Sequence, residues 1–545
     1  MGFISYLFWI FCDLIFYKFI LFFIYYFFLH INYKNFKMGG GLMQLVAYGA
    51  QDIYLTGNPQ ITFFKVVYRR HTNFSMEAIE QTFSGTPDFG RKVYCTISRN
   101  GDLIHRVYLQ VRLPSVQAAS SDYFRWVNWV GHALIKNVEV EIGGQRIDKH
   151  YGDWLHIWNE LSQTSGKQAG YANMVGNVDK LFRPVSTGGT ASTASATDPR
   201  LSGDIQGVTP ATTLFVPLQF WFCRNPGLAL PLIALQYHEV KINLEFRELA
   251  ELCGVKASGT VPTASLDSAS LYVDYIYLDT DERRRFAQVS HEYLIEQLQF
   301  TGDESVSQTN VKVKLNFNHP CKELVWVVQL DGSVEAAPTG ALVNGRQWFN
   351  YTDRIDPTPY SQGDAMNMND IMDGIIDTSP ESGIDSTNDM TFGINSSLGA
   401  GPATGPGGVS GIGGTSGASN VLQSNGLLSN INAAYDQGLN PVFRAKLQLN
   451  GHDRFSEREG RYFNLVQPYQ HHENVPVTGI NVYSFGLKPE EHQPSGTCNM
   501  SRIDNATLHL TLSPRVTTGA KVRVYATNYN VLRIMSGMGG LAYSN

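Results

Sequence analysis

Cysteine is scarce in this sequence, and charge is low. The 545 residues include six Cys, and 17% are charged, with 42 Lys+Arg against 48 Asp+Glu. The cysteines are scattered, without a CxxC pair or a neighbouring His at zinc-ligand spacing, so we expect buried reduced thiols and neither a disulfide framework nor a zinc site. The net charge of −6 lacks the basic excess of a general nucleic-acid binder, so no nucleic-acid partner is expected.

Motifs for catalysis and cofactor binding are also missing. The sequence contains no GxxxxGK[ST], GxSxG or HExxH, and no GxGxxG after a strand. The adjacent pair His471 and His472 is expected on a surface or loop, because neighbouring rings on a strand point to different sides. A carbohydrate-active enzyme would need two carboxylates converging about 5–10 Å apart, and no compelling pair stands out. We expect no cofactor, no metal and no enzymatic activity.

The first 37 residues differ in composition from the rest. They hold 16 of the 65 aromatic residues, while Ala, Val, Pro, Thr, Arg, Glu and Gln are absent. The favoured amino acids have AT-rich codons, so we interpret residues 1–37 as an upstream extension read in frame before a second start at Met38. The alternative is a membrane anchor, since residues 14–31 just reach spanning length, although Lys18 lies within that run.

Period-two alternation of apolar and polar residues dominates the remaining chain. It is clearest in residues 240–246 (VKINLEF) and 311–317 (VKVKLNF), and recurs in 107–113, 138–142, 508–512 and 522–524. Such alternation is typical of antiparallel strands with one face on a core and the other in water. Helical periodicity is scarce, and residues 151–161 (YGDWLHIWNEL) form the best short helix. The chain is therefore predicted to be all-β, built as sandwiches or barrels.

Two stretches are too poor in bulky apolar residues to pack a core. They are residues 186–199 and about 378–437, the second including LGAGPATGPGGVSGIGGTSGAS, and both are predicted to be long surface loops. Glycosylation sequons in or near the second loop make Asn350 and Asn395 candidate glycan acceptors if the chain passes through the secretory pathway.

An internal repeat indicates two related halves. Residues 139–155 (EVEIGGQRIDKHYGDWL) and 446–463 (KLQLNGHDRFSEREGRYF) each contain a strand, a GG or NG turn, an Arg, and a Gly followed by aromatic residues. Residues 220–246 and 483–512 form a looser second pair in the same order, which favours tandem duplication. The junction is predicted near residues 281–288 (DERRRFAQ), where Arg283–Arg285 could meet phosphate, a neighbouring subunit or only solvent.

Three long segments stand out: MQLVAYGAQDIYLTGNPQITFFKVVYRRHTNF (43–74), FWFCRNPGLALPLIALQYHEVKINLEFRE (220–248) and YSFGLKPEEHQPSGTCNMSRIDNATLHL (483–510), the last continuing to YATNYNVLRIMSGMGGLAYSN (525–545). These segments resemble the major capsid proteins of nucleocytoplasmic large DNA viruses, and most closely the mimivirus-like and algal-virus branch. The resemblance spans about residues 38–545.

The resemblance implies two tandem eight-stranded jelly rolls with long loop inserts and few short helices. We expect an N-terminal arm at 38–62, a first jelly roll at 63–286, a second at 287–530 with the insert at about 378–437, and a C-terminal tail at 531–545. It also implies a homotrimeric capsomer of pseudo-hexameric outline that tiles an icosahedral shell over an internal membrane.

The expected partners are copies of the chain in its own and neighbouring capsomers, and minor capsid and penton proteins. The expected location is the virion capsid, assembled in the host cytoplasm. Tyr48, Tyr54, Phe63 and Phe64 are candidate anchors of the assembly arm, because aromatic residues carry much interface energy; ordinary packing on their own jelly roll is the alternative. A jelly-roll protein that binds glycans for host attachment is the alternative function.

Overall fold

The structure, a computed structural model, describes residues 40–117, 123–182, 185–186, 208–255, 261–335, 346–353, 439–514, 516 and 519–543. The predicted extension at 1–37, the insert at about 378–437 and Asn395 lie outside these residues. The chain divides into two units between Thr72 and Asn73. The described part of the N-terminal unit contains two short helices, α2 (Gly40–Val46) and α3 (Ile53–Thr56).

The first half of the main unit is built on two antiparallel sheets, each with a path of four main strands. Their strand orders are β1-β14-β3-β10 and β2-β12-β6-β7. The strands are β1 (Phe74–Gln81), β2 (Lys92–Thr96), β3 (Leu103–Leu113), β6 (Ile135–Ile142), β7 (Gln145–Tyr151), β10 (Thr212–Pro217), β12 (Val240–Phe246) and β14 (Ser268–Leu278). Six shorter strands are β4 (Val116–Gln117), β5 (Tyr123–Trp126), β8 (Val185–Ser186), β9 (Val208–Thr209), β11 (Leu230–Pro231) and β13 (Cys253–Val255).

The second half repeats this arrangement. Its sheets have the orders β15-β25-β18-β22 and β17-β24-β19-β20. The strands are β15 (His291–Phe300), β17 (Asn310–Leu315), β18 (Pro320–Leu330), β19 (Val442–Leu449), β20 (His452–Asp453), β22 (Asn481–Ser484), β24 (Ala506–Leu512) and β25 (Ala520–Met535). Four shorter strands are β16 (Glu304–Val306), β21 (Arg458–Glu459), β23 (Cys498–Asn499) and β26 (Met538–Leu541).

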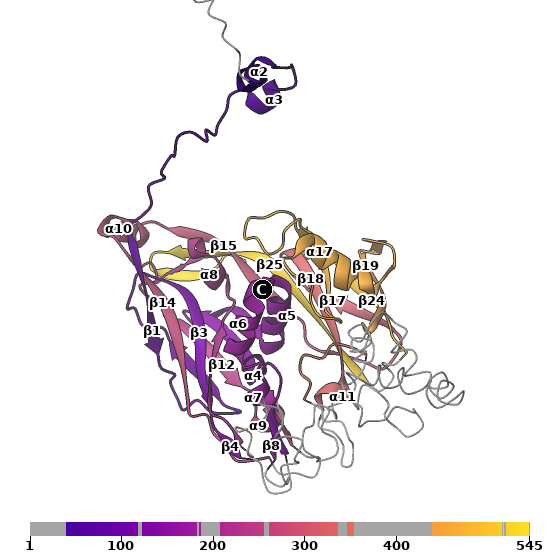
Figure 1. The fold of residues 1–545 in the computed structure, drawn as a ribbon. Helices are drawn as coiled ribbons and strands as arrows, with labels where there is room; N and C mark the ends of the chain where they lie inside the picture. The colour runs from indigo at the N-terminus through magenta and orange to yellow at the C-terminus, as the bar shows by residue number, and fades with distance from the viewer. Residues whose placement is uncertain are drawn as a thin grey trace, which may run out of the picture. The chain divides into compact units, whose positions relative to one another are not determined.

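The two halves share one topology. When the eight main strands of each half are numbered along the chain, both halves have one sheet in the order 1-8-3-6 and another in the order 2-7-4-5. This is an eight-stranded jelly roll present twice in tandem, as expected from the sequence, and Figure 1 shows the two sandwiches side by side. The predicted duplication is thus visible in the strand order.

Alternation and turn chemistry explain the local structure. In β12 the residues alternate strictly between buried and half-buried, because one face lies on the core of the first half. The predicted GG and NG hairpin turns are present: Gly143 and Gly144 have φ of 58° and 84°, and Asn450 and Gly451 have φ of 50° and 82°. These left-handed angles favour Gly and Asn, which explains the turn sequences.

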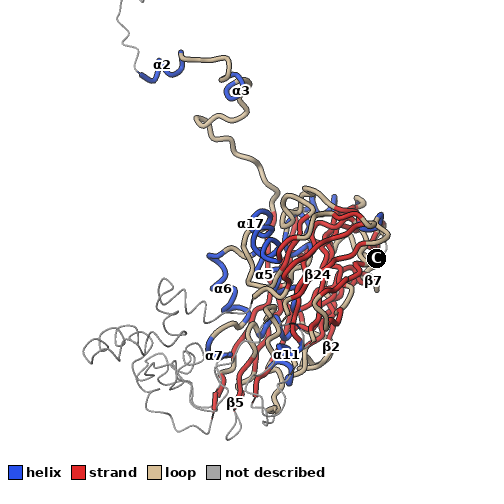
Figure 2. Tube along the Cα trace, turned by 90° about the vertical axis from the view of Figure 1, so that its right-hand side faces the viewer, coloured by secondary structure: helices blue, strands red, loops and turns tan. Residues whose placement is uncertain are grey.

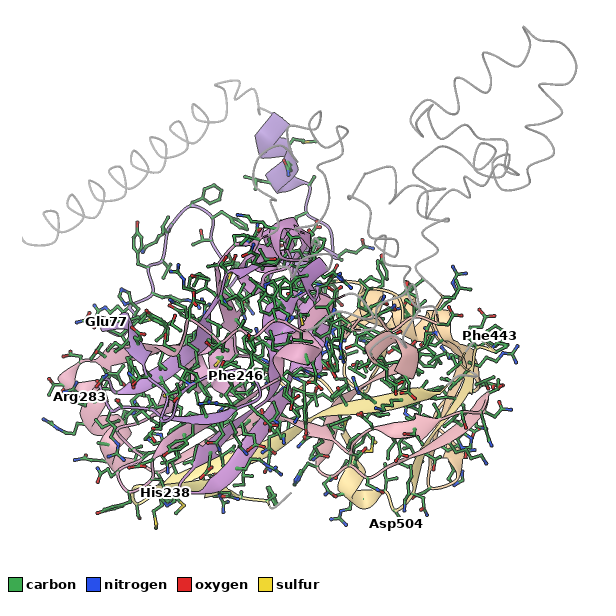
Figure 3. The ribbon with its side chains drawn as sticks, turned by 90° about the horizontal axis from the view of Figure 1, so that it is seen from below. Glu77, His238, Phe246, Arg283, Phe443 and Asp504 are labelled. Atoms are coloured by element: carbon green, nitrogen blue, oxygen red, sulfur yellow. The ribbon has the colours of Figure 1, made fainter. Side chains whose placement is uncertain are left out.

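Helices connect the strands and are short. The longest are α5 (Gly152–Ser162), which matches the helix predicted at 151–161, and α6 (Ser165–Val175). The others in the main unit are α4 (Val130–Leu134), α7 (Asp179–Phe182), α8 (Trp221–Arg224), α9 (Leu249–Leu252), α10 (Thr280–Gln288), α11 (Asp331–Val334) and α17 (Gln467–His471). Figure 2 shows α5, α6 and α17 on one side of the strand layers.

Two segments differ from the sequence expectations. The segment near 281–288 is helix α10, which Asp279 caps by accepting from the Thr280 N–H, and its Arg283 forms an ion pair of 2.9 Å with Asp102. Residues 531–545 were expected to be a tail, and this was wrong for the described part: β25 extends to Met535 and pairs with β26. The strands continue there because the backbone groups of β26 are satisfied by β25.

The ends of the main unit are occupied by different elements. Figure 1 shows α10 and the start of β1 at one end, and β4, β8 and α11 at the other. The elements β8 and α11 flank undescribed chain, including the Ser/Thr-rich stretch at 186–199. The described residues next to these stretches, in β8 and α11, therefore lie at the end opposite to the one where β1 begins.

Candidate assembly interface

Helix α5 of the first half packs on a sheet of the second half. Its buried apolar residues form one stripe, which we call the covered stripe: Trp154, Ile157, Trp158 and Leu161. They share a hydrophobic cluster with residues of the sheet β15-β25-β18-β22, namely Val325, Val327, Val482 and Tyr525. The Trp154 and Tyr525 rings lie 5.5 Å apart. This contact fixes the second jelly roll against the first.

The sheet offers the helix one row of side chains. Phe300 pairs with Tyr525, Tyr525 with Val325, and Val325 with Val482, so the row crosses all four strands. Neighbouring positions of the same strands, such as Leu324 and Trp326, point instead into the core of the second half. The alternation of a strand therefore gives this sheet two apolar faces, one for its own core and one for α5.

A buried ion pair joins the same two elements. Arg523 of β25 donates to Asp153 at the start of α5 (2.6 Å), to Asp303 (2.9 Å) and to Gln329 (2.9 Å). Burial opposes the charged form, but Asp153 and Asp303 raise the pKa of Arg523 above its usual range. Asp153 also sits at the helix N-terminus, where a negative charge is favourable. Removing either partner would leave the other charge buried and less well compensated, since Asp153 would keep only Arg247 at 3.8 Å and Arg523 would keep Asp303.

A second ionic cluster links α8 to the same sheet. Glu296 of β15 accepts from Arg224 of the first half (3.0 Å) and from Lys322 (2.7 Å), and His492 lies 3.6 Å away. Burial raises the pKa of Glu296, but His492 and the two cations lower it to about 2. The Arg224 guanidinium also lies 3.8 Å from the Trp158 ring centroid. Polar groups thus surround the apolar contact of α5.

His472 lies in a loop, as expected, but its side chain is not at the surface. It follows α17, and its ring is fully buried between Glu323 (3.1 Å) and Glu490 (2.8 Å). Burial lowers the pKa of His472, but these two carboxylates raise it to about 9. Sequence reasoning missed the site because residues 467–471 were not recognised as a helix. The signal available was the internal repeat, which, continued past Phe463, places a counterpart of α5 there.

Two further buried histidines are His132 of α4 and His156 of α5. His132 and His156 have ring centroids 5.8 Å apart, and His132 Nε2 lies 2.8 Å from the Tyr171 hydroxyl. Phe349 packs 4.3 Å from the His156 ring. Burial lowers the pKa of His156 to about 3, and burial followed by His156 lowers that of His132 well below its usual range. Both rings are therefore neutral at physiological pH.

The predicted arm anchors lie in the N-terminal unit. Within it Tyr48, Tyr54, Phe63 and Phe64 are exposed, Phe64 to 97%. The structure does not bring these four side chains into one cluster, and their role in assembly stays a prediction.

The sequon at Asn350 is structured. Its side-chain amide donates to Gln347 Oε1 at 2.7 Å and accepts from the Thr352 hydroxyl at 2.7 Å, and Tyr351 between them is buried. A glycan on Asn350 would displace the first of these bonds. Whether Asn350 is modified stays a prediction.

Free thiols, metal ligands and membrane-spanning helices are the remaining kinds of candidate site among the described residues. Cys95, Cys223, Cys253 and Cys321 are buried free thiols, as predicted, and Cys498 is half-buried. Among the described residues, no group of three or more His, Cys, Asp or Glu side chains is placed to hold a metal ion. No helix of the described chain has the length and apolar character needed to span a membrane.

Comparison with known proteins gives consistent matches over both halves. Residues 62–279 match the family described as major capsid protein N-terminus, and residues 282–540 match the family of large eukaryotic DNA virus major capsid proteins. The chain is 56% identical to the major capsid protein of Phaeocystis pouchetii virus and 40% identical to that of Paramecium bursaria Chlorella virus 1. Both matches cover 93% of this chain and all of the relative.

Solved structures show the same fold. A chain of the PBCV-1 virus capsid superposes with a TM-score of 0.60 at 36% identity, covering 89% of this chain and all of that one. The Faustovirus major capsid protein superposes with a TM-score of 0.59 at 13% identity, covering 90% of this chain and 94% of that one, and shows likeness of fold alone.

Proposed function

The chain belongs to the family of large eukaryotic DNA virus major capsid proteins, and from that premise we propose that three copies form a capsomer of pseudo-hexameric outline. Its role is structural, as part of the virus capsid. The observation that carries the proposal is the repeated topology: two jelly rolls per chain give three chains six similar sandwiches. A closed ring of copies uses heterologous contacts, and further lateral contacts extend the lattice without local closure.

The domain boundaries follow this scheme. We assign residues 63–286 to the first jelly roll, residues 287–530 with the strands that continue to Leu541 to the second, and 38–62 to an arm, with the extension at 1–37 dispensable. The family match from residue 62 to 279 and from 282 to 540 supports the division, as does the position of α10 between β14 and β15. Intact-mass analysis of virions tests the extension, and peptides from residues 1–37 would contradict it.

The two ends of the main unit have different roles in the proposal. The end that carries the inserts faces outward, and the end where β1 begins faces the shell interior, near minor capsid and penton proteins and an internal membrane. Assembly takes place in the host cytoplasm, and catalysis plays no part. The location of β8 and α11 opposite to α10 supports this polarity.

Light scattering and negative-stain microscopy of the full chain test the three-copy capsomer. We expect a mass of three chains and particles of hexagonal outline. A monodisperse single chain under native conditions would contradict the proposal.

Deletion of residues 38–62 tests the arm. Among the described residues the sheets begin at Phe74, so the truncated protein is expected to keep its thermal unfolding temperature while capsomer or shell assembly is impaired. Unchanged assembly would exclude the role of Tyr48 and Tyr54 as anchors.

A further inference from the structure

Each half has a helix at the same place in its jelly roll. In the first half α5 follows β7 and begins at Gly152; in the second, a helix follows β21 and begins at Gly460, with π geometry over Tyr462–Val466 and α geometry over Gln467–His471. Both glycines sit against backbone oxygens, since a Cβ would clash with His132 O at Gly152 and with Val442 O at Gly460. The two helices are therefore equivalent, at an offset of 308 residues.

Equivalent side chains of the two helices differ in exposure. Leu155 and its equivalent Phe463 are both fully buried in their own jelly-roll cores. The covered stripe lies under the second half. Its equivalents, which we call the exposed stripe, are Tyr462, Leu465, Val466 and Tyr469, of which the last three are exposed and Tyr462 is half-buried against the core of the second half. Tyr469 is 79% exposed, against none for its equivalent Leu161. The covered stripe thus packs within the chain, whereas the exposed stripe has no comparable contact with the described residues.

The sheet that would receive such a stripe is also duplicated. In the second half the row Phe300, Tyr525, Val325 and Val482 receives α5. In the first half the matching row crosses β1, β14, β3 and β10, and consists of Glu80, Tyr272, Tyr108 and Pro217. We call this row, with the neighbouring Phe215, the exposed face.

The exposed face carries aromatic residues outside the cores. Tyr108 and Tyr272 stack with centroids 5.3 Å apart, and Phe215 packs against Tyr108 at 6.3 Å. All three are half-buried and belong to none of the hydrophobic clusters found among the described residues. An aromatic surface of this kind is typical of an interface.

The charges on the two leftover surfaces are complementary. Asp153, which pairs with Arg523 at the junction, is replaced by Arg461 at the equivalent position. The exposed face carries the carboxylates of Glu80, whose Oε2 lies 3.4 Å from the Tyr272 hydroxyl, and of Asp274, two residues along β14, and also the exposed Arg106 of β3. Ser270 stands at the position equivalent to Arg523, so the ion pair of the junction is not repeated there, and Arg461 would instead face Glu80 or Asp274.

We propose that the exposed stripe of one copy packs on the exposed face of a second copy, reproducing between chains the contact that α5 makes within the chain. This rests on the proposed function, in that the partner is another copy in the capsomer. The contact is heterologous, because helix and sheet belong to different halves, and Figure 1 shows β1 and α17 on opposite sides of the body. Within- and between-chain contacts then alternate around a closed ring of six jelly rolls.

Surface substitutions in the full chain test the contact. Leu465→Glu and Tyr272→Glu each place a charge in the proposed interface, and we expect the light-scattering mass to fall from three chains to one. Leu439→Glu and Tyr237→Glu are the matched controls at residues that are also exposed, and they should keep the mass of three chains. Circular dichroism verifies that each variant is folded.

Cysteine cross-linking tests the contact independently of these variants. Because Trp154 meets Tyr525, Tyr462 should meet Tyr272 of another copy, so the double variant Tyr462→Cys with Tyr272→Cys should oxidise to covalent species of up to three chains. Each single cysteine variant should give none.

The outcomes separate this contact from the three-copy capsomer. A three-chain mass in both glutamate variants, together with no cross-link, would overturn the contact while leaving the capsomer standing. A single-chain mass for the unmodified protein would contradict the capsomer. In that case the double cysteine variant, oxidised at high protein concentration, would still test the contact, and absence of a cross-link would overturn it.

Discussion

Acid should loosen the junction between the two jelly rolls through His156. This side chain lies in α5, enclosed by Trp129 at 5.2 Å and Phe349 at 4.3 Å, and its Nδ1 is buried without a hydrogen-bond partner. Burial lowers its pKa from 6.5 to about 3. In the closed state α5 is packed and His156 is buried, and in the opened state α5 has come away and His156 meets water. The opened state takes up a proton below pH 6.5 and the closed state does not. The stability that burial of neutral His156 gives the closed state is therefore fully present above pH 6.5 and is lost as pH falls toward 3.

The size of this loss of stability follows from how far the pH lies below the ordinary pKa of histidine. A pH of 5 lies about 1.5 units below the ordinary pKa of 6.5. Compared with neutral pH, the equilibrium therefore shifts toward the opened state by about 2 kcal/mol, or roughly 30-fold. His132 adds in the same direction, because burial also lowers its pKa. Hydrogen exchange of peptides from Gly152–Ser162, corrected for intrinsic rates, should therefore lose at least this much protection between pH 7.5 and 5.

A matched variant isolates the contribution of the ring. His156→Gln cannot take up the proton, so its loss of protection should be smaller by about 30-fold than in the unmodified chain, whereas His452→Gln, at an exposed site, should behave like the unmodified chain. Equal protection of the α5 peptides at both pH values, or an equal loss in His156→Gln, would refute the reasoning.

Three other perturbations follow from the structure. Arg523→Met leaves Asp153 buried with only the 3.8 Å ion pair to Arg247 and should destabilise the fold by about 3–5 kcal/mol, whereas adding Asp153→Asn should recover part of this in thermal unfolding. Gly460→Ala drives a Cβ into Val442 O and should abolish soluble yield, while Gly166→Ala, with open space around it in α6, should be neutral or stabilising by up to about 1 kcal/mol. The pKa of His472, raised to about 9 by Glu323 and Glu490 against burial, means that its contribution is complete below pH 6.5 and lost as pH rises toward 9. His472→Gln should flatten the alkaline rise in hydrogen exchange of residues 467–497, and an unchanged rise would contradict the assignment.

The fold could be predicted from local patterns to a large extent. Residues 240–246 alternate strictly, and the structure forms β12 over the same residues. The GG and NG turns were predicted because only a few residue types tolerate positive φ, and that restriction is visible in sequence. The helix at 151–161 was found because its apolar residues lie on one side.

The interface could not be predicted in the same way. Asp153 and Arg523 are 370 positions apart, and no local spacing indicates that they meet. His472 looked like a surface residue because burial of a charged ring depends on Glu323 and Glu490, which are brought together by the sheet and a later loop. The difference between the covered and exposed stripes was also invisible, because exposure depends on how the two halves pack.

The strand order has a consequence for the timing of folding during synthesis. In each half the last main strand, β14 or β25, occupies an interior place between two strands made much earlier. The 205 residues from Phe74 to Leu278 take roughly 10–40 s to synthesise at ribosomal rates, so the first sandwich cannot close before then. Because β14 also supplies Tyr272, the exposed face is incomplete until the chain has been made as far as Leu278.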